Sequence, residues 1–417
     1  MAQLFRRVLL ATIGASALAT AITRQPVTAA PATDQTPIAS AANAPSTKRE
    51  LGQDATKDKT DLAKKDKDKD KDKDKDKDGA SRKQWTKSER QELLKRAQVW
   101  MPTNIPAMDL RHGPDRPGAF QPGEEVVCDY AYEKELPGTS RKFNCAISKD
   151  DVVKVRYGAD NGKVEGEVLA TRLLWALGFG ADAVYPVKVR CRGCSANPWV
   201  DRQPVAGEQV FDPAAIERKF PGHEIEVGKN DGGWSWKELR HVDERLGGAT
   251  VAELDAMRLL AVFIQHTDNK IINERFVCLP GGLADGMCSR PFLFMHDVGL
   301  TFGHANLFDA NDEGSVSFEE WAATPMWRAN PKMCVGHMRR SATGMLGDPQ
   351  ISEAGRKFLA DLLVQLTDKQ LHDLFEVAQV ERRSRKPGTE APAARVDEWV
   401  SVFKAKREEI VNNRCEK

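Results

Sequence analysis

The chain has 417 residues, enough for one large domain or two ordinary ones once polar tails are set aside. Its lysines and arginines number 62 and its aspartates and glutamates 61, so the composition shows no global bias toward nucleic acid or anionic membranes. Hydrophobic residues make up 41% of the chain, so the folded part can bury a substantial core. We therefore expect a globular protein with no nucleic-acid partner.

The first 30 residues have the pattern of an export signal. MAQLFRR supplies a basic start, VLLATIGASALATAI an apolar core, and small-residue cleavage sites follow at ALA (17–19) and TAA (28–30). A membrane anchor is the alternative, but the run is short and alanine-rich, and no later segment approaches spanning length. We expect residues 1–30 to be a signal peptide and the mature chain, without a membrane span, to be secreted or periplasmic.

A polar segment follows the signal. Residues 31–87 are rich in Ala, Pro, Thr, Asp and Lys and include KKDKDKDKDKDKDKD. Strict Lys–Asp alternation has no apolar face, so burial cannot offset the entropy of ordering it. We expect a disordered linker; a calcium- or surface-binding tract is the alternative.

The next elements are mostly strands. A short amphipathic helix is expected at residues 88–98, and a glycine-containing turn joins the first two of three strand-like runs. A helix pattern that stops at glycine comes next, before a further strand. The runs are strands at 125–132, 141–147 and 151–157, a helix at 164–179 and a strand at 183–191.

Helices dominate the rest of the chain. A polar stretch rich in Gly and Trp precedes an apolar helix, two strands bridged by a hairpin, and three C-terminal helices. The polar stretch is 193–247 and the apolar helix is 250–265. The two strands and their hairpin are 275–296, and the three C-terminal helices are 352–366, 368–380 and 396–411. The order predicts an α+β protein with a β-rich N-terminal lobe at 88–205 and a helical C-terminal lobe at 206–417.

The eight cysteines agree with export, because an even number of thiols can pair in an oxidising compartment. Two pairs flank short turns, one pair forms a CRGC unit, and two cysteines remain. The expected disulfides are Cys128–Cys145, Cys278–Cys288, Cys191–Cys194 and Cys334–Cys415. Zinc binding at CRGC is the alternative, but no second close ligand pair is visible.

Two polar segments follow apolar ones at related places. HTDNKIIN, residues 266–273, ends the apolar helix, and HDVG, residues 296–299, follows the second strand of the hairpin. Antiparallel strands bring the start of one beside the end of the other, so we expect these two segments to be neighbours. Asp268, Asn273 and Asp297 are then the carboxylate and amide side chains that phosphoryl transfer needs to orient a hydroxyl and bind magnesium.

A cation for the nucleotide phosphates is also present. Lys154 lies in a predicted strand, and the following helix carries Glu165 and Glu167, either of which could pair with it. The turn LPGTSRKF, between the first two strands, lies where a loop covering phosphates is expected.

The chain resembles the protein-kinase-like superfamily. HTDNKIIN resembles the kinase catalytic loop H-R-D-x-K-x-x-N, and HDVG resembles D-F-G. TDNKIIN also resembles the T-D-D-H-x-x-N loop of HipA-like kinases and the D-R-H-x-x-N loop of phosphatidylinositol kinases, and GTSRKF resembles the G-x-x-x-K-F turn of the HipA-like branch. The resemblance covers roughly residues 120–300. It implies a two-lobed protein-kinase-like fold that uses ATP and magnesium.

The resemblance implies three sets of site residues. Asp268, His266 and Lys270 form the catalytic set, and Asn273 and Asp297 hold the metal. The nucleotide-binding set is Lys154, Glu167, Lys142 and Ser140. The alternatives are purely structural roles: His266 and His296 would be core residues, and Lys154 and Arg156 would be solvated strand residues.

Several features depart from ordinary protein kinases. The chain has no G-x-G-x-x-G loop and no A-P-E segment, Thr267 replaces the usual arginine, and a hairpin is inserted between Asn273 and Asp297. We therefore weigh two functions. One is magnesium-dependent phosphoryl transfer from a nucleotide to a hydroxyl on a protein or small molecule; the other is an inactive pseudokinase that acts as a binding or scaffold protein.

One further motif resembles a calcium loop. DANDEGSVSFEE, residues 309–320, follows the EF-hand spacing, except that Glu stands at the fifth position where Asp or Asn is usual. An acidic surface turn is the preferred interpretation, and calcium is not an expected ligand.

Overall fold

The computed structural model describes the chain from residue 84 onward, with gaps. The predicted signal peptide and most of the predicted linker lie outside the described residues, and all described residues belong to one compact unit, Lys73–Lys417. The described ranges are 84–133, 136, 138–228, 232–303, 317–329, 334–382 and 393–415.

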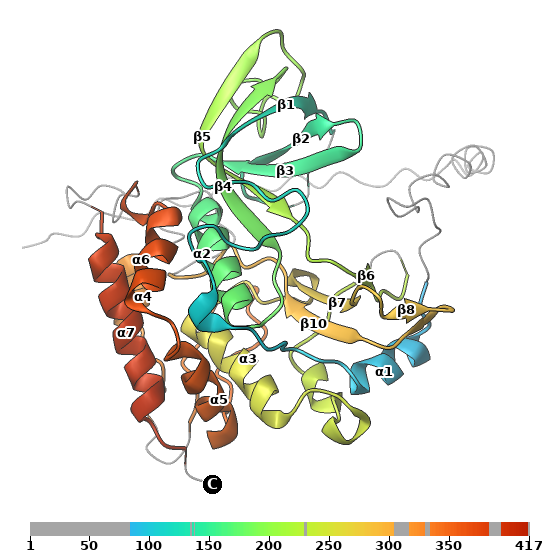
Figure 1. Ribbon diagram of the computed structural model, residues 1–417, viewed down its shortest axis with the longest axis vertical. Coiled ribbons are helices and arrows are strands. Elements are labelled where there is room, and N and C mark those ends of the chain that lie inside the picture. Colours follow the sequence, from blue (N-terminus) through green and yellow to red (C-terminus); the bar gives the residue numbers. More distant parts are fainter. Residues whose placement is uncertain are drawn as a thin grey trace, which may run out of the picture. The chain divides into compact units, whose positions relative to one another are not determined.

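Five strands close a barrel in the order β1-β2-β3-β5-β4 (Figure 1). They are β1 (Glu125–Ala131), β2 (Lys142–Ser148), β3 (Asp151–Tyr157), β4 (Ala183–Arg192) and β5 (Glu208–Arg218). Neighbours are antiparallel, except that β1 and β4 are parallel. Alternation along β3 sends Val153, Val155 and Tyr157 into the barrel core and leaves Lys154 and Arg156 on the outer face.

Strand β5 was not predicted from the sequence pattern. It lies in the stretch expected to be irregular, and it carries the β-rich part of the chain past the lobe boundary expected at residue 205. Pro213 cannot donate a backbone hydrogen bond, so it argues against a central strand. It is accommodated beside the register shift between Val187 and Val189 of β4, where the ladder is already interrupted.

Helix α2 (Gly162–Ala176) links the barrel to the helical part of the chain. It starts at Asn161, whose side chain accepts a hydrogen bond from the Lys163 amide, and it packs against β4 and against α6 (Asp368–Val377). Fourteen of its fifteen residues are buried. The turn after it needs a glycine at Gly178, where φ is 84° and a Cβ would collide with the carbonyl oxygen of Met101.

A second sheet carries the two polar segments. Its order is β10-β7-β6, formed by β10 (Pro291–Met295), β7 (Glu274–Cys278) and β6 (His223–Glu224). A small hairpin of β8 (Leu283–Ala284) and β9 (Met287–Cys288) lies between β7 and β10 in sequence. β7 and β10 pair antiparallel, as predicted.

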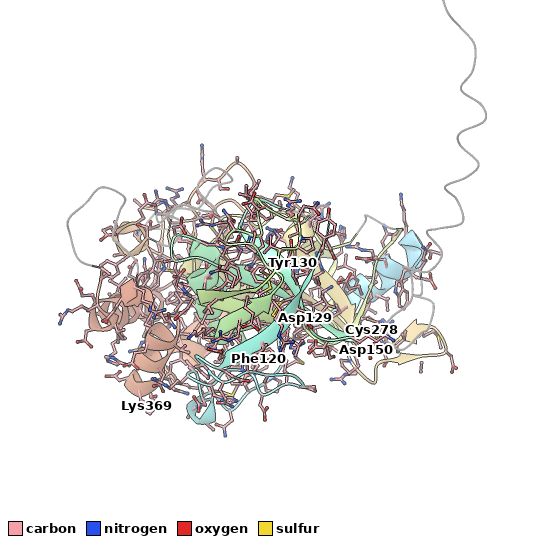
Figure 2. All side chains as sticks on the ribbon, turned by 90° about the horizontal axis from the view of Figure 1, so that it is seen from above. Phe120, Asp129, Tyr130, Asp150, Cys278 and Lys369 are labelled. Atoms are coloured by element: carbon pink, nitrogen blue, oxygen red, sulfur yellow. A yellow bond between two sulfur atoms is a disulfide. The ribbon has the colours of Figure 1, made fainter. Side chains whose placement is uncertain are left out.

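Helices form the rest of the described fold. α3 (Val251–Phe263) packs on α5, and α7 packs on both α5 and α6. Lys369 on α6 projects outward (Figure 2), and its side chain is 80% exposed. The remaining helices are α1 (Lys87–Lys95), α4 (Phe318–Ala323), α5 (Glu353–Leu363), α6 (Asp368–Val377) and α7 (Val396–Asn412), with 3₁₀ turns η1 (Ile105–Ala107), η2 (Glu238–His241), η3 (Glu244–Leu246), η4 (Ile271–Asn273) and η5 (Val380–Arg382). Strands and helices together give the expected α+β class.

All four predicted disulfides are present, and no cysteine is free. Their Cα atoms lie between 5.2 and 5.8 Å apart, within the usual bridging range. CRGC therefore holds a disulfide, which leaves no thiolate there for zinc. Four disulfides fit an extracellular or periplasmic environment.

Two other expectations concern membranes and calcium. Within the described ranges, every helix is too short or too polar to span a bilayer. Residues 309–316 of the calcium-like motif lie outside the described residues. Glu320, at its end, lies in α4 and pairs with Arg339 at 3.3 Å.

Candidate functional site

The loop after α3 folds around the carboxylate of Asp268. Lys270 Nζ donates to both oxygens of that carboxylate at 2.9 and 3.0 Å. Asn273 Nδ2 donates to Asp268 Oδ2 at 2.8 Å and to the Asp268 carbonyl at 2.6 Å. Asp268 is only 3% exposed, so these bonds satisfy a carboxylate that water reaches poorly.

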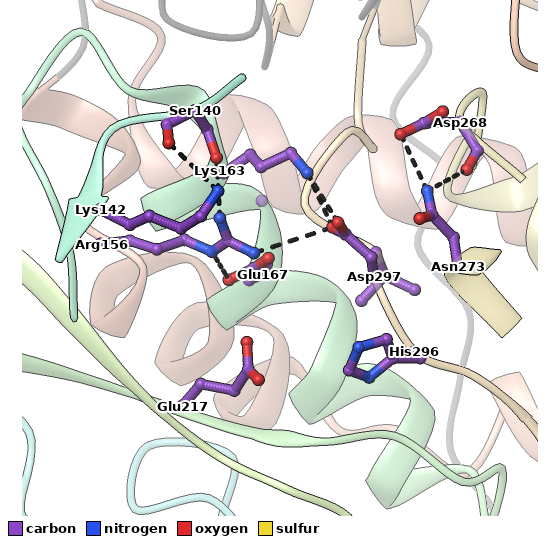
Figure 3. A network of polar contacts seen from close by, with 12 residues as sticks. Ser140, Lys142, Arg156, Lys163, Glu167, Glu217, Asp268, Asn273, His296 and Asp297 are labelled. Carbon is purple, nitrogen blue, oxygen red and sulfur yellow. Dashed lines mark hydrogen bonds and ion pairs between the residues drawn. The ribbon is translucent and has the colours of Figure 1, made fainter. Parts of the chain in front are cut away.

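The two polar segments meet, as predicted (Figure 3). The carbonyl oxygen of Asn273 accepts hydrogen bonds from the backbone amides of His296 at 2.9 Å and Asp297 at 3.1 Å. The pairing of β7 with β10 produces this contact, because η4 runs into β7 just where β10 ends. Asp268, Asn273 and Asp297 therefore belong to one local arrangement.

Asp297 is an ionised carboxylate held by cations. Lys163 Nζ donates to both of its oxygens at 2.8 and 2.9 Å, and Arg156 Nη2 lies 4.0 Å away. Burial opposes ionisation, but Lys163 and Arg156 outweigh it and hold the pKa of the Asp297 carboxyl well below its usual range. Charge is thus concentrated at the position where the sequence predicted a metal ligand.

Arg156 takes the place predicted for Lys154. Its Nε donates to Glu167 Oε2 at 2.5 Å, and its Nη1 donates to Ser140 Oγ at 2.8 Å. Lys154 pairs instead with Glu217 of β5. The prediction that a helix glutamate pairs with Lys154 is therefore wrong, because Arg156, two positions along on the same face of β3, reaches α2.

The first residue of β2 adds another cation. Lys142 is buried, its Nζ lies 3.5 Å from the Ser140 carbonyl oxygen, and it stacks over the Trp199 ring at 5.1 Å. Burial, followed by the charges of Arg156 and Lys163, lowers the pKa of Lys142 to about 7. An anion in this cluster would favour the protonated form of Lys142.

The two histidines have buried partners. His266 is fully buried, and its Nε2 lies 3.5 Å from Glu274 Oε1, so its side chain has the core position that was the alternative to a catalytic role. Burial raises the pKa of Glu274 to about 7. His296 Nδ1 lies 2.5 Å from Asp182 Oδ2; burial favours its neutral form, but Asp182 outweighs this effect and raises the pKa of His296.

Lys163 is the main residue that the sequence prediction missed. It lies four positions before Glu167 in α2, so both side chains share one helix face, and that spacing was a usable signal. A Cβ at Gly299 would lie 2.8 Å from Lys163 Cγ and 3.0 Å from Glu167 Cγ. The glycine of D-x-G therefore lets this face of α2 lie against the Asp297 segment.

The donor set suits magnesium and phosphate. The side-chain nitrogen of Asn273 donates to Asp268, so its side-chain oxygen Oδ1 is the acceptor that could bind a metal, and Asp297 offers an ionised carboxylate. Mg²⁺ prefers oxygen ligands of this kind. Lys142, Arg156 and Lys163 gather on the adjacent side and would bind phosphate oxygens. Each role is an expectation from the donor chemistry.

Comparisons with known proteins give little further guidance. No protein-family model and no curated protein sequence matches the chain. Among solved structures, a Helicobacter pylori proinflammatory kinase, CtkA, aligns with a TM-score of 0.37 and 9% sequence identity, over 70% of this chain and 96% of that chain. A likeness of this size transfers neither activity nor residue roles, so function has to be argued from the site.

Proposed function

We propose that this chain is an exported kinase-like protein that transfers a phosphoryl group from a nucleotide to a hydroxyl, with magnesium. The observation that carries the proposal is the hydrogen bonding of the Asn273 carbonyl to the amides of His296 and Asp297. It joins H-x-D-x-x-x-x-N and D-x-G in one site, beside the Arg156–Glu167 pair. In this proposal the barrel and the helical part are the two lobes of a kinase-like fold.

Asp268 would orient the acceptor hydroxyl. Its carboxylate already accepts bonds from Lys270 and Asn273, which fix its position, and a carboxylate oxygen can accept the hydroxyl proton as the new bond forms. Lys270 is 26% exposed at its side chain, so it can also turn toward a bound phosphate. Asn273 and Asp297 would hold magnesium, whose charge stabilises the transferring phosphoryl group.

Lys163 would change partners when nucleotide binds. Without ligand it neutralises Asp297, through bonds to both carboxylate oxygens. Bound magnesium would supply the counter-charge for Asp297, so the Lys163 ammonium could then contact phosphate oxygens. Lys142 and Arg156 would complete the phosphate contacts, with Ser140 fixing the orientation of Arg156.

A pseudokinase is the second candidate. Two observations favour it: both oxygens of Asp297 are bonded to Lys163, and the strand cation beside the helix glutamate is an arginine. Nucleoside triphosphates are also scarce outside the bacterial cytoplasm. Such a protein would keep the fold and bind a ligand without transfer.

Calorimetric titration of the mature chain with ATP, with and without magnesium, tests the proposal. We expect binding that depends on magnesium, and transfer of labelled phosphate to the chain or to water. Lys163→Met should weaken nucleotide binding about tenfold or more, the loss expected for a charge-assisted contact to phosphate. A parent chain that binds no nucleotide at any magnesium concentration would contradict phosphoryl transfer and favour the binding or scaffold protein in its place.

A further inference from the structure

A second cluster of cations lines a cavity outside this site. The cavity has a volume of about 380 Å³ and is lined by the polar residues Thr324, Arg328, His337, Arg339 and Arg340. This volume falls within the range of small-ligand pockets, roughly 300–1,000 Å³, and exceeds what one oxyanion needs.

The arginines of this cluster differ in whether they have a carboxylate partner. Arg328 donates to both oxygens of Asp348 at 2.9 and 3.1 Å, and Arg339 pairs with Glu320 at 3.3 Å. Arg340 is exposed and has no ion pair or hydrogen-bond partner within the described part of the chain. Among the described residues, three arginines thus face two carboxylates, and the Arg340 guanidinium has no carboxylate partner.

His337 adds an unsatisfied polar atom at the same place. Its Nδ1 is shielded from solvent and has no hydrogen-bond partner among the described residues. A buried polar atom without a partner is uncommon, and a ligand oxygen is one group that would satisfy it.

Hydrogen bonds join the segment that lines the cavity to the loop that carries Asp268. Gln265 Nε2 donates to the His337 carbonyl at 2.8 Å, and Gln265 Oε1 accepts from the Arg339 amide at 3.0 Å. Asn269 Oδ1 accepts from the amides of Met345 at 2.5 Å and Leu346 at 2.7 Å. The segment 337–346 is therefore fixed to both sides of Asp268 in sequence.

We infer that this cavity binds an anionic side chain of a polypeptide acceptor, phosphoryl or carboxylate, and so positions the acceptor hydroxyl near Asp268. Arginine forks match the paired oxygens of both groups. The role in positioning an acceptor rests on the proposed phosphoryl transfer, whereas anion binding is inferred from the cavity residues alone. It names the acceptor class as an acidic or phosphorylated polypeptide.

Protonation of His337 should accompany binding. Burial, followed by the charge of Arg328, lowers the pKa of His337; Arg339 and Lys406 act in the same direction, and Asp348 acts against them. An anion in the cavity would stabilise the imidazolium, so affinity for a carboxylate peptide should rise as pH falls below the ordinary imidazole value of about 6.5.

The test uses the full mature chain and three peptides of one serine-containing sequence, with phosphoserine, glutamate or alanine at a single position. Arg340→Gln should weaken calorimetric binding of the phosphoserine and glutamate peptides about threefold to tenfold, because one partly exposed charge contact is lost. Arg245→Gln, which makes the same charge change at a residue that is 88% exposed, should leave binding unchanged. His337→Gln should abolish the rise in affinity at low pH.

The outcomes separate this inference from the proposed function. Equal binding of the alanine peptide, no effect of Arg340→Gln, or no binding of either anionic peptide overturns the inference, as does inorganic phosphate binding as tightly as the peptides. ATP titrations of the same variants should match the parent. Anionic peptides bound through Arg340 by a chain that binds no nucleotide would keep the anion site and remove the kinase proposal.

Discussion

Arg156 is the side chain on which the polar network of the site depends. It is 4% exposed, and it links Ser140 of the turn, Glu167 of α2 and the neighbourhood of Asp297. The sequence predicted that β3 would supply a cation and α2 a glutamate, but it gave no basis for choosing Lys154 or Arg156. Both residues lie on the same face of β3, and only the position of α2 and the presence of Glu217 on β5 decide between them.

Arg156→Met and Lys154→Met should behave differently. Arg156→Met leaves Glu167 buried without its cation, so we expect a loss of about 3–5 kcal/mol of stability together with loss of nucleotide binding. Lys154→Met should cost less, because that lysine is 28% exposed. Denaturant unfolding and ATP titration measure both effects. The double variant Arg156→Met/Glu167→Met should regain stability but not binding; regained binding would refute a role for Arg156 at the nucleotide.

The buried Glu274 predicts how stability depends on pH. Its pKa is raised by burial to about 7 in the folded chain from 4.5, so the folded state binds more protons than the unfolded state between these values. Stability from this group is therefore present below about pH 4.5 and is lost as pH rises toward about 7. Glu274→Gln should be more stable than the parent above pH 7, by up to roughly 3 kcal/mol.

Thermal unfolding across pH measures this difference. Glu92→Gln, at a side chain that is 64% exposed, is the matched control and should follow the parent. Parent and Glu274→Gln curves that stay parallel from pH 4 to 8 would show that Glu274 keeps its ordinary pKa.

At the scale of elements, local patterns identified most strands and helices. β3 spans Asp151–Tyr157, the range of the predicted strand, and the three C-terminal helices begin within a residue of their predicted starts. β5 was missed because Pro213 interrupts its local pattern and because one of its two partners, β3, is separated from it by α2 and β4. Barrel closure is thus a long-range property that short windows do not contain.

The disulfides give a prediction at the same scale. Cys334 and Cys415 lie 81 residues apart and Cys278 and Cys288 lie 10 apart, so the first bridge constrains the unfolded chain more. Loop-closure entropy gives about 4.5 kcal/mol for the long loop and about 2.7 for the short one. Replacing each pair by alanine and measuring unfolding in denaturant should show the larger loss for Cys334/Cys415. The reverse order would mean that local packing outweighs chain entropy.

For the whole molecule, the order of strands and helices predicted an α+β chain, and the cysteines predicted four disulfides that suit an exported protein. The meeting of two polar segments was also foreseeable, because a hairpin joins them. A glutamate of α2 was expected at the site, but the contact of Lys163 with Asp297 was not, since it depends on how a helix from the first part of the chain packs beside Gly299. That packing supplies Lys163 and Glu167 and completes the site.

The central claim is that Asp268 and Asp297 have separate roles in phosphoryl transfer. Paired titration of ATP with magnesium against Asp297→Asn and Asp268→Asn, with a phosphoryl-transfer assay of both, tests it most directly. Asp297→Asn should lose magnesium-dependent binding, because an amide cannot balance the divalent charge. Asp268→Asn should bind as the parent does and lose transfer, because its carboxylate acts on the acceptor in the transition state. Full transfer by Asp268→Asn, or undiminished magnesium-dependent binding by Asp297→Asn, would contradict the claim.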